Sequence, residues 1–163
     1  MAKVILILGS DISTDIIYPG RYMATVLPNE TPQYAFADLP INKHLIAREI
    51  PPGSIVVAGK NFGCGSSREQ AASCLKGWEL CVVAKGFARI FMQNAVNLGL
   101  DLVICPGIEA EDGDELEIDG SQVVNHTSGQ HFAIKHLPEA RQAIIHAGGL
   151  IPYTRQLLLK DKD

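Results

Sequence analysis

The residues best suited to chemistry lie together in residues 59–70, which read GKNFGCGSSREQ. Gly63 and Gly65 allow positive φ angles and a close approach of the backbone to a ligand. The Ser-Ser-Arg triplet at residues 66–68 adds two hydroxyls and a guanidinium fork, which suit carboxylates and phosphates. A helix that begins at this point also directs free amide hydrogens toward an anion. The stretch therefore predicts an anion-binding loop.

The spacing differs from both common nucleotide-binding loops, because no Lys follows the last glycine and the third glycine of GxGxxG is missing. A purely structural role is the remaining alternative. Ser66 and Glu69 have the spacing of a helix capping box, and Ser67 and Gln70 offer the same box one residue later. Capping accounts for both serines but not for Arg68 or the flanking glycines. We therefore favour a functional loop and keep the helix cap as the alternative.

The elements around this loop follow from the hydrophobic pattern. The sequence predicts strand, helix, strand, helix and strand at residues 54–58, 66–76, 80–84, 88–98 and 101–105. Strands that alternate with helices form βαβ units with a parallel sheet. Open α/β sheets bind ligands at the carboxyl ends of their strands, so residues 59–70 are expected at the ligand-binding edge.

The chain before this core is less regular. Residues 3–8 are apolar and predict a strand. Residues 9–22 are rich in Gly, Ser, Asp and Pro, which indicates a long loop without a regular element. Residues 33–49 contain helical spacing within an otherwise ambiguous pattern.

The chain after this core predicts an antiparallel hairpin and a final helix. The Asp-Gly pair at 119–120 lies between two short strand-like runs and is typical of a hairpin turn. A helix starts at Pro138 and is stopped by the glycine pair at 148–149, before a mixed segment at residues 151–159. Residues 1–163 thus form one α/β domain with a parallel βαβ core and an appended antiparallel hairpin.

Charge and composition exclude several classes of function. The net charge is −4, and acidic residues concentrate between residues 109 and 119, which would repel a phosphate backbone. Nucleic acid is therefore not an expected partner. No apolar run approaches the roughly 20 residues that cross a bilayer, so no membrane partner is expected either.

Cysteine and histidine spacing argues against a metal site on this chain. The cysteines at positions 64, 74, 81 and 105 form no CxxC pair, which predicts free thiols in the cytoplasm and neither an iron-sulfur nor a zinc site. His126, His131 and His136 are spaced by five residues. Neighbours at an odd spacing along a strand point to opposite faces, so these side chains are not expected to share a metal.

Three ordered blocks of the sequence resemble one family. They are STDIIYPGRY at residues 13–22, GKNFGCGSSREQA at residues 59–71 and VVAKGFARIFMQNAVNLGL at residues 82–100. Together they are similar to the swivelling domain of the aconitase superfamily, especially in the small subunits of 3-isopropylmalate dehydratases. The resemblance extends through nearly the whole chain and implies a single swivelling β/β/α domain.

The resemblance implies roles for the loop residues. In that family the first serine of GSSR is the general base that deprotonates carbon beside a carboxylate, and here that serine is Ser66. Helix amides and Arg68 would stabilise the serine alkoxide and make it a stronger base. Ser67 and Arg68 are expected to hold a substrate carboxylate, with Gly65 in the same binding site. Asp15, from the TD pair, resembles a supporting or proton-relay group.

Arg21 and Cys64 are further candidates for the substrate site. Arg21 could hold another carboxylate, although an exposed loop arginine is commonly just solvated. Cys64 lies between two glycines near a helix start. It suits a reactive thiol, but a lone thiol in such a place more often packs or lines a pocket, and we favour the lining role.

The family divides its enzyme between two chains. The resemblance implies a larger subunit with a [4Fe-4S] cluster, whose open iron takes the leaving hydroxyl as a Lewis acid. The expected assembly is a heterodimer or heterotetramer, and this chain would hold no cofactor and would be inactive alone. The reaction would be reversible removal and re-addition of water on a small dicarboxylic or tricarboxylic hydroxy acid.

The substrate is less defined than the reaction. Interconversion of 2- and 3-isopropylmalate in leucine biosynthesis is the first hypothesis, and 2,3-dimethylmalate, citraconate and homoaconitate are alternatives. The loop after PGRY, residues 23–30, does not discriminate among them. A hypothesis of another class is a non-catalytic anion-binding module, but the intact triplet at residues 66–68 favours an enzyme.

Overall fold

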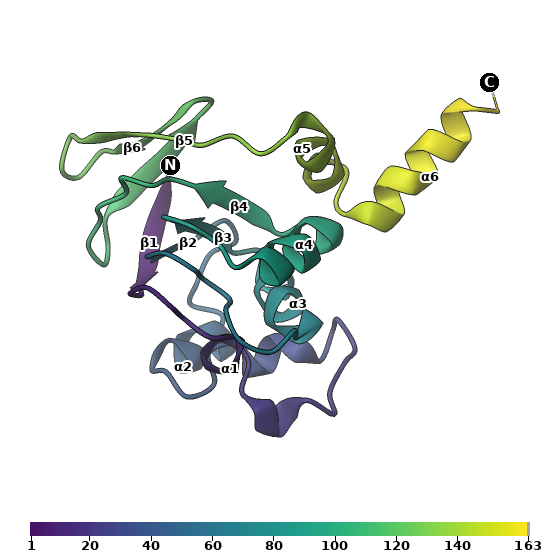
Figure 1. The fold of residues 1–163 in the computed structure, drawn as a ribbon. Coiled ribbons are helices and arrows are strands. Elements are labelled where there is room, and N and C mark those ends of the chain that lie inside the picture. The colour runs from purple at the N-terminus through teal and green to yellow at the C-terminus, as the bar shows by residue number, and fades with distance from the viewer. Residues whose placement is uncertain (163) are drawn as a thin grey trace.

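A curled sheet of seven strands forms the centre of the molecule, and the computed structural model describes residues 1–162 (Figure 1). The strand order is β4-β3-β2-β1-β5-β6-β7. The parallel strands are β1 (Ala2–Ile7), β2 (Ile55–Ala58), β3 (Cys81–Ala84) and β4 (Asp101–Ile104). The antiparallel strands are β5 (Glu115–Asp119), β6 (Gln122–Asn125) and β7 (His131–Ala133).

β1 joins the two parts of the sheet, because it pairs parallel with β2 and antiparallel with β5. An isolated antiparallel bridge between Ile104 and Lys135 brings the far edges together, so the sheet curls back toward itself. The predicted α/β class and parallel core are confirmed, with β1 as a fourth parallel strand.

Alternate residues of the parallel strands pack into two separate hydrophobic clusters. In β2, Val56 and Ala58 belong to the larger cluster, whereas Ile55 and Val57 belong to the smaller one. β3 repeats this alternation. Because successive side chains of a strand point to opposite faces, burial on both faces explains why these strands are continuously apolar.

Two helices cover the side of the larger cluster and start at the carboxyl ends of their preceding strands (Figure 1). They are α3 (Glu69–Gly77), after β2, and α4 (Arg89–Leu98), after β3. Leu75 of α3 and Phe91 of α4 are buried in the cluster. α4 ends at Gly99, which is left-handed with φ of 75° and forms the predicted helix stop.

The chain before β2 is more ordered than its composition indicates. The segment predicted as a long loop contains α1 (Thr14–Ile17) and a 3₁₀ turn at Gly20–Tyr22. Ser13 caps α1, because its hydroxyl accepts a hydrogen bond from the amide of Ile16. A second 3₁₀ turn (Thr31–Tyr34) and α2 (Ile41–Ile46) follow. Helices this short leave little periodicity to recognise in a sequence.

The appended hairpin is confirmed, with its turn one residue later than expected. Asp119 pairs with Gln122, so the two loop residues are Gly120 and Ser121, and Gly120 has a φ of 53°. β7 adds a third antiparallel strand that the sequence did not indicate.

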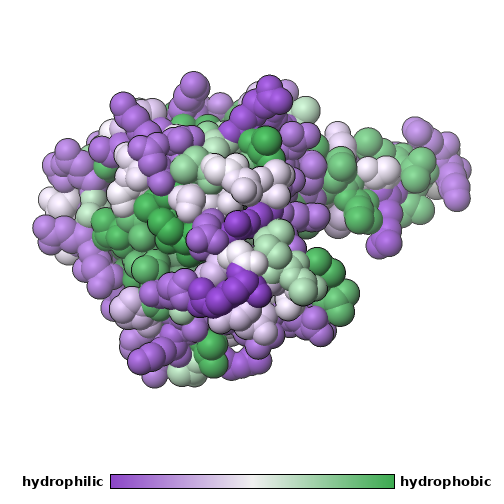
Figure 2. All heavy atoms as spheres, turned by 60° about the horizontal axis from the view of Figure 1, so that its bottom comes forward, coloured by the Kyte–Doolittle hydropathy of each residue, from purple (hydrophilic) through white to green (hydrophobic). Residues whose placement is uncertain are grey.

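The carboxyl-terminal part consists of α5 (Glu139–His146) and α6 (Leu150–Lys160). α5 starts after Pro138 and ends before Gly148, as predicted. The prediction of a mixed segment after the glycines was wrong, because α6 is a continuous helix. It projects from the body (Figure 1), and Figure 2 shows apolar side chains along it. None of its residues is buried.

Within residues 1–162, no helix has both the length and the apolar character that a membrane crossing requires.

Candidate active site

Residues 59–68 connect β2 to α3 at the carboxyl ends of the parallel strands, as the sequence predicts. The connection that follows β3, residues 85–88, lies beside them. The amide of Phe62 donates to the carbonyl of Gly86 at 3.1 Å, and the amide of Ala88 donates to the carbonyl of Phe62 at 2.9 Å. Two neighbouring connections therefore form one surface at this edge.

Packing explains why residue 63 is a glycine. Gly63 has a φ of +85°, and a Cβ built on it would lie 2.3 Å from Cγ of Phe91. Phe91 packs edge-on against Phe62, with ring centroids 5.2 Å apart. Only a residue without a side chain lets the loop lie this close to α4.

A segment from the start of the chain holds the same loop. The amide of Gly63 donates to the carbonyl of Ile12 at 2.7 Å, and the amide of Thr14 donates to the carbonyl of Cys64 at 2.9 Å. The hydroxyl of Thr14 donates to the carbonyl of Ser66 at 2.8 Å. Residues about fifty positions apart in the chain thus meet at one place.

The beginning of α3 rules out helix capping as the role of the two serines. The helix starts at Glu69 rather than near Ser66, its N-cap is Arg68, and no side chain caps it. The backbone amides of Ser66, Ser67 and Arg68 donate no hydrogen bond to other groups of residues 1–162. Successive unpaired amides beside a helix start form an anion-binding concavity.

Arg68 is fixed in place by two acceptors. Its Nη1 donates to Oδ1 of Asp15 at 2.8 Å and to the carbonyl of Tyr18 at 3.1 Å, and only 16% of its side chain is exposed. The amide of Gly20 donates to the same Asp15 oxygen at 2.7 Å. The hydrogen bond from Arg68 and then that from Gly20 lower the pKa of Asp15. Asp15 is therefore a carboxylate at neutral pH and supports the guanidinium.

A hollow of about 390 Å³ opens beside the Ser-Ser-Arg triplet. Its charged lining residues are Arg68 and Arg89, and no carboxylate lines it. Its other lining residues come from α1, from the loops after β2 and β3, and from α4: Thr14, Asn61, Gly63, Cys64, Gly65, Ser66, Ser67, Ala88, Ile90, Phe91 and Asn94. The positive charge and the unpaired amides suit a small polycarboxylate.

The hollow contains polar residues that were absent from the predicted site. Arg89 and Asn94 come from α4, and Asn61 from the loop after β2. The signal for Arg89 was its position as the first residue of a helix that follows a parallel strand, since such connections meet at one edge. Nothing in the sequence distinguished Asn94 from an ordinary polar residue of an amphipathic helix.

Arg21 and Cys64 are placed differently from each other. Cys64 lines the hollow and is half-buried. Arg21 is not among the lining residues, and its guanidinium bonds to both carboxylate oxygens of Asp38 and lies 4.7 Å from the centre of the Tyr22 ring. Of the predicted site residues, all but Arg21 and Asp15 line the hollow. Asp15 does not line it but bonds to Arg68, which does.

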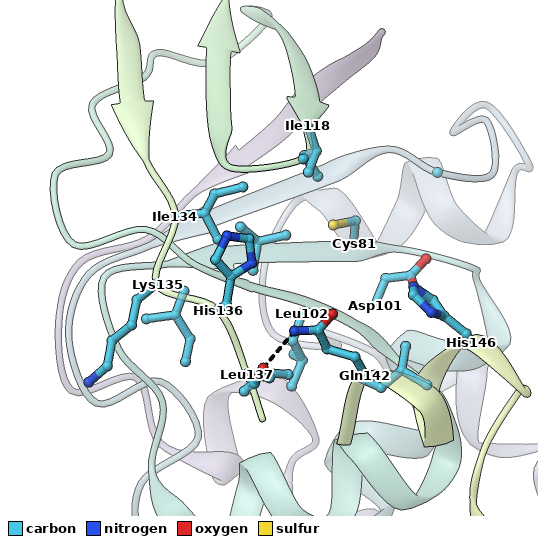
Figure 3. A pocket seen from close by; sticks show the side chains of 15 residues that line it. Cys81, Asp101, Leu102, Ile118, Ile134, Lys135, His136, Leu137, Gln142 and His146 are labelled. Carbon is cyan, nitrogen blue, oxygen red and sulfur yellow. Dashed lines mark hydrogen bonds between the residues drawn. The ribbon is translucent and has the colours of Figure 1, made fainter. Parts of the chain in front are cut away.

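A second hollow, of about 430 Å³, lies at the opposite edge of the sheet (Figure 3). Cys81 and Asp101, the first residues of β3 and β4, line it. Figure 3 shows Ile134 and His136 on one side of it and His146 on the other. Burial raises the pKa of the Cys81 thiol to about 12. None of the predicted site residues lines this hollow.

The histidines of the hairpin region do not converge. His126 bonds to Glu117 at 2.7 Å, His131 bonds to Gln122 at 3.2 Å, and His136 lines the second hollow. Across residues 1–162, no three His, Cys, Asp or Glu side chains are grouped closely enough to hold a metal ion.

Comparison with known proteins points to one family. Residues 28–104 match the family model of the aconitase C-terminal domain. The 3-isopropylmalate dehydratase small subunit of Methanosarcina mazei is 44% identical over 154 residues, covering 92% of this chain and 93% of that protein. The corresponding subunit of Caldicellulosiruptor bescii is 46% identical over 158 residues, with coverage of 93% and 92%.

Two proteins of Methanocaldococcus jannaschii extend the comparison. An isopropylmalate/citramalate isomerase small subunit is 40% identical over 163 residues, covering 94% of this chain and 93% of that protein. The crystal structure of a 3-isopropylmalate dehydratase from the same organism superposes with a TM-score of 0.86 at 36% identity, covering 99% of this chain and 98% of the other.

Proposed function

Because the chain belongs to the family of 3-isopropylmalate dehydratase small subunits, we propose that it completes a two-chain hydro-lyase of leucine biosynthesis. The enzyme interconverts 2-isopropylmalate and 3-isopropylmalate by removing water and adding it back. In this assembly, residues 1–163 act as the swivelling domain that presents the Ser-Ser-Arg triplet to the substrate.

One observation supports this function above the others. At the triplet, three successive amides are unpaired within residues 1–162, and two arginines but no carboxylate line the hollow. A site of this kind stabilises a carboxylate and also the negative charge that develops beside it when a proton leaves the neighbouring carbon. In a purely structural helix start, a side chain such as that of Ser66 or Ser67 would accept hydrogen bonds from the amides of the first turn.

Ser66 is the proposed base. Its deprotonated oxygen takes the proton from the carbon next to a substrate carboxylate and returns a proton to carbon during rehydration. A serine oxygen is a weak base unless its negative charge is stabilised. The unpaired amides that follow Ser66 supply that stabilisation. Ser66 is exposed, lines the hollow and does not cap α3.

Arg68 and Ser67 are proposed to hold the substrate carboxylate. Asp15 and the Tyr18 carbonyl bind Nη1 of Arg68, and Nη2 makes no hydrogen bond within residues 1–162, so it is available to the substrate. Gly65 lets the backbone approach, and its φ of +91° favours glycine. Asp15 orients Arg68 and does not act as the first base.

The remaining parts of the enzyme come from a larger subunit. The [4Fe-4S] cluster that the family resemblance implies is proposed to lie on that subunit. When bound there, it supplies a Lewis acid for the hydroxyl that leaves. A heterodimer or heterotetramer in the cytoplasm is proposed, with this chain inactive alone.

Citramalate is a second candidate substrate, since a relative at 40% identity is an isopropylmalate/citramalate isomerase small subunit. The loop at residues 23–30 exposes Val26 at 63% and Leu27 at 53%. Exposed aliphatic side chains suit the branched side chain of isopropylmalate better than the single methyl of citramalate. Isopropylmalate therefore remains the primary proposal.

Reconstitution tests the function. The purified chain is mixed with a 3-isopropylmalate dehydratase large subunit loaded with iron and sulfide, and the absorbance of the unsaturated acid is followed with 3-isopropylmalate, citramalate and 2,3-dimethylmalate. We expect turnover only with both subunits and the highest kcat/KM for isopropylmalate. Assembly without turnover of any acid would leave a non-catalytic anion-binding module, and highest kcat/KM for citramalate would select the second candidate.

A further inference from the structure

One residue from the start of the chain bonds to the carbonyls on both sides of Gly65. Thr14 is the first residue of α1 and is 3% exposed. Its amide donates to the carbonyl of Cys64 at 2.9 Å, and its hydroxyl donates to the carbonyl of Ser66 at 2.8 Å. Gly65 lies between these acceptors with a φ of +91°. The backbone around the proposed base is therefore clamped from one side.

The Thr14 hydroxyl also sets the direction of the following amide. A trans peptide is planar, and its carbonyl oxygen and amide hydrogen point in opposite directions. Because the carbonyl of Ser66 points at Thr14, the amide hydrogen of Ser67 points away from Thr14. That amide has no acceptor within residues 1–162. The direction of the Ser67 amide is therefore fixed by the hydrogen bond that the Ser66 carbonyl, in the same peptide, accepts from Thr14.

The hydroxyl of Thr14 is not needed to form α1. Ser13 caps that helix through the amide of Ile16, which leaves the Thr14 hydroxyl with the Ser66 carbonyl as its partner. A Val side chain has nearly the same volume, but it replaces the hydroxyl with a methyl group and is therefore not an equivalent substitution at this buried position. The hydrogen bond to the loop is what separates the two residue types.

We propose that Thr14 is a positioning residue for the reaction: its hydroxyl orients the Ser66–Ser67 peptide, and through it the Ser66 oxygen and the Ser67 amide. The proposal rests on the function proposed above, in which these two groups act on the substrate. Without the hydroxyl, the peptide at 66–67 can rotate, and the carbonyl of Ser66 loses its only partner within residues 1–162.

The first test compares Thr14→Val, which removes the hydroxyl, with Thr14→Ser, which keeps it, in the reconstituted two-subunit enzyme. A small misplacement of catalytic groups costs up to about a hundredfold in rate, so we expect Thr14→Val to lower kcat about 10-fold to 100-fold with a smaller change in KM. Thr14→Ser is expected to stay within about threefold of the wild type, because the hydrogen bond remains. Thr14→Ala is the substitute if Thr14→Val does not fold.

The second test uses the isolated chain and needs no turnover. In proton–nitrogen correlation spectra, the Ser67 amide should shift in Thr14→Val and keep its wild-type position in Thr14→Ser. If the wild-type pair turns over none of the acids, the proposed function fails, whereas these spectra still decide whether the hydroxyl orients the peptide. Wild-type kcat in Thr14→Val, an unmoved Ser67 amide, or equal losses in the Val and Ser variants would overturn the proposal.

Discussion

The loop at residues 59–68 and helix α6 are built in opposite ways. The loop is tied to residues about fifty positions earlier by the hydrogen bonds of Thr14 and Asp15, and to the next loop through Phe62. α6 has no buried residue and projects from the body (Figure 1). The loop is held by several long-range hydrogen bonds and α6 buries no side chain, so substitutions should have large effects at the loop and small effects on α6.

Ser66→Ala should have the largest effect on activity. General acid–base groups contribute about 10²-fold to 10⁴-fold, so kcat of the reconstituted enzyme should fall by at least about a hundredfold if Ser66 is the base. The thermal midpoint of the isolated chain should not change, because Ser66 is exposed and caps no helix. Steady-state kinetics and thermal unfolding check the two parts, with Ser121→Ala in the hairpin turn as the control. Near-normal turnover would remove Ser66 from the mechanism.

Arg68→Lys and Arg21→Lys form a matched pair. Lys keeps the charge but lacks the guanidinium fork, so it cannot bridge Asp15 and the Tyr18 carbonyl while still reaching the substrate. We expect Arg68→Lys to lower kcat/KM roughly a hundredfold. Arg21 is exposed and paired with Asp38 outside the hollow, so Arg21→Lys should change kcat/KM by less than about threefold.

The same pair decides whether Arg21 contacts the substrate. A rise in KM of the Arg21→Lys enzyme comparable to that of Arg68→Lys would mean that Arg21 leaves Asp38 when the subunits and substrate assemble. That outcome would mean that the substrate site includes Arg21 as well as the loop at residues 59–68. Large effects of substitution would then not be confined to that loop.

Gly63→Ala and Gly65→Ala distinguish the cost of a steric clash from the cost of backbone strain. Both residues have positive φ, but a Cβ at Gly63 would collide with Phe91 at 2.3 Å, whereas at Gly65 its nearest neighbour is Ser13 Cβ at 3.8 Å. Gly65→Ala should lower the free energy of unfolding by about 1 kcal/mol for backbone strain. Gly63→Ala should lower it by about 3 kcal/mol, because overpacking adds to the strain. Urea unfolding of the isolated chain measures both, and equal losses would contradict the packing argument.

The parallel core could be predicted from sequence because its strands are buried on both faces. Continuous apolar runs such as residues 54–58 and 80–84, separated by helical patterns and glycines, leave few other topologies. The hairpin followed from the Asp-Gly signal at 119–120, with an error of one residue. β7 was missed because three residues with an exposed and half-buried pattern carry little periodicity.

The site could be predicted only in part. The glycines and the Ser-Ser-Arg triplet mark an anion loop in the sequence itself, and the family resemblance added Asp15. The hydrogen bonds of Thr14 to Cys64 and Ser66 join segments about fifty positions apart in the chain, which no local pattern encodes. The serine-cap alternative likewise needed the observed start of α3 at Glu69 to be rejected.

Leu75→Ala and Leu158→Ala make the same change on a buried and a projecting helix. Leu75 of α3 is 0% exposed and Leu158 of α6 is 59% exposed. Leu75→Ala should lower the free energy of unfolding by about 3 kcal/mol and the thermal midpoint by about 9 °C. Leu158→Ala should change the free energy of unfolding by less than about 0.5 kcal/mol.

The concentration dependence of the thermal midpoint completes this test. If α6 makes no contact with a second molecule in the isolated chain, the thermal midpoint should not depend on protein concentration, either for the wild type or for Leu158→Ala. A wild-type midpoint that rises with concentration and a Leu158→Ala midpoint that does not would mean that the apolar side of α6 is covered by association. In that case, the difference between the loop at residues 59–68 and α6 would apply only to the monomer.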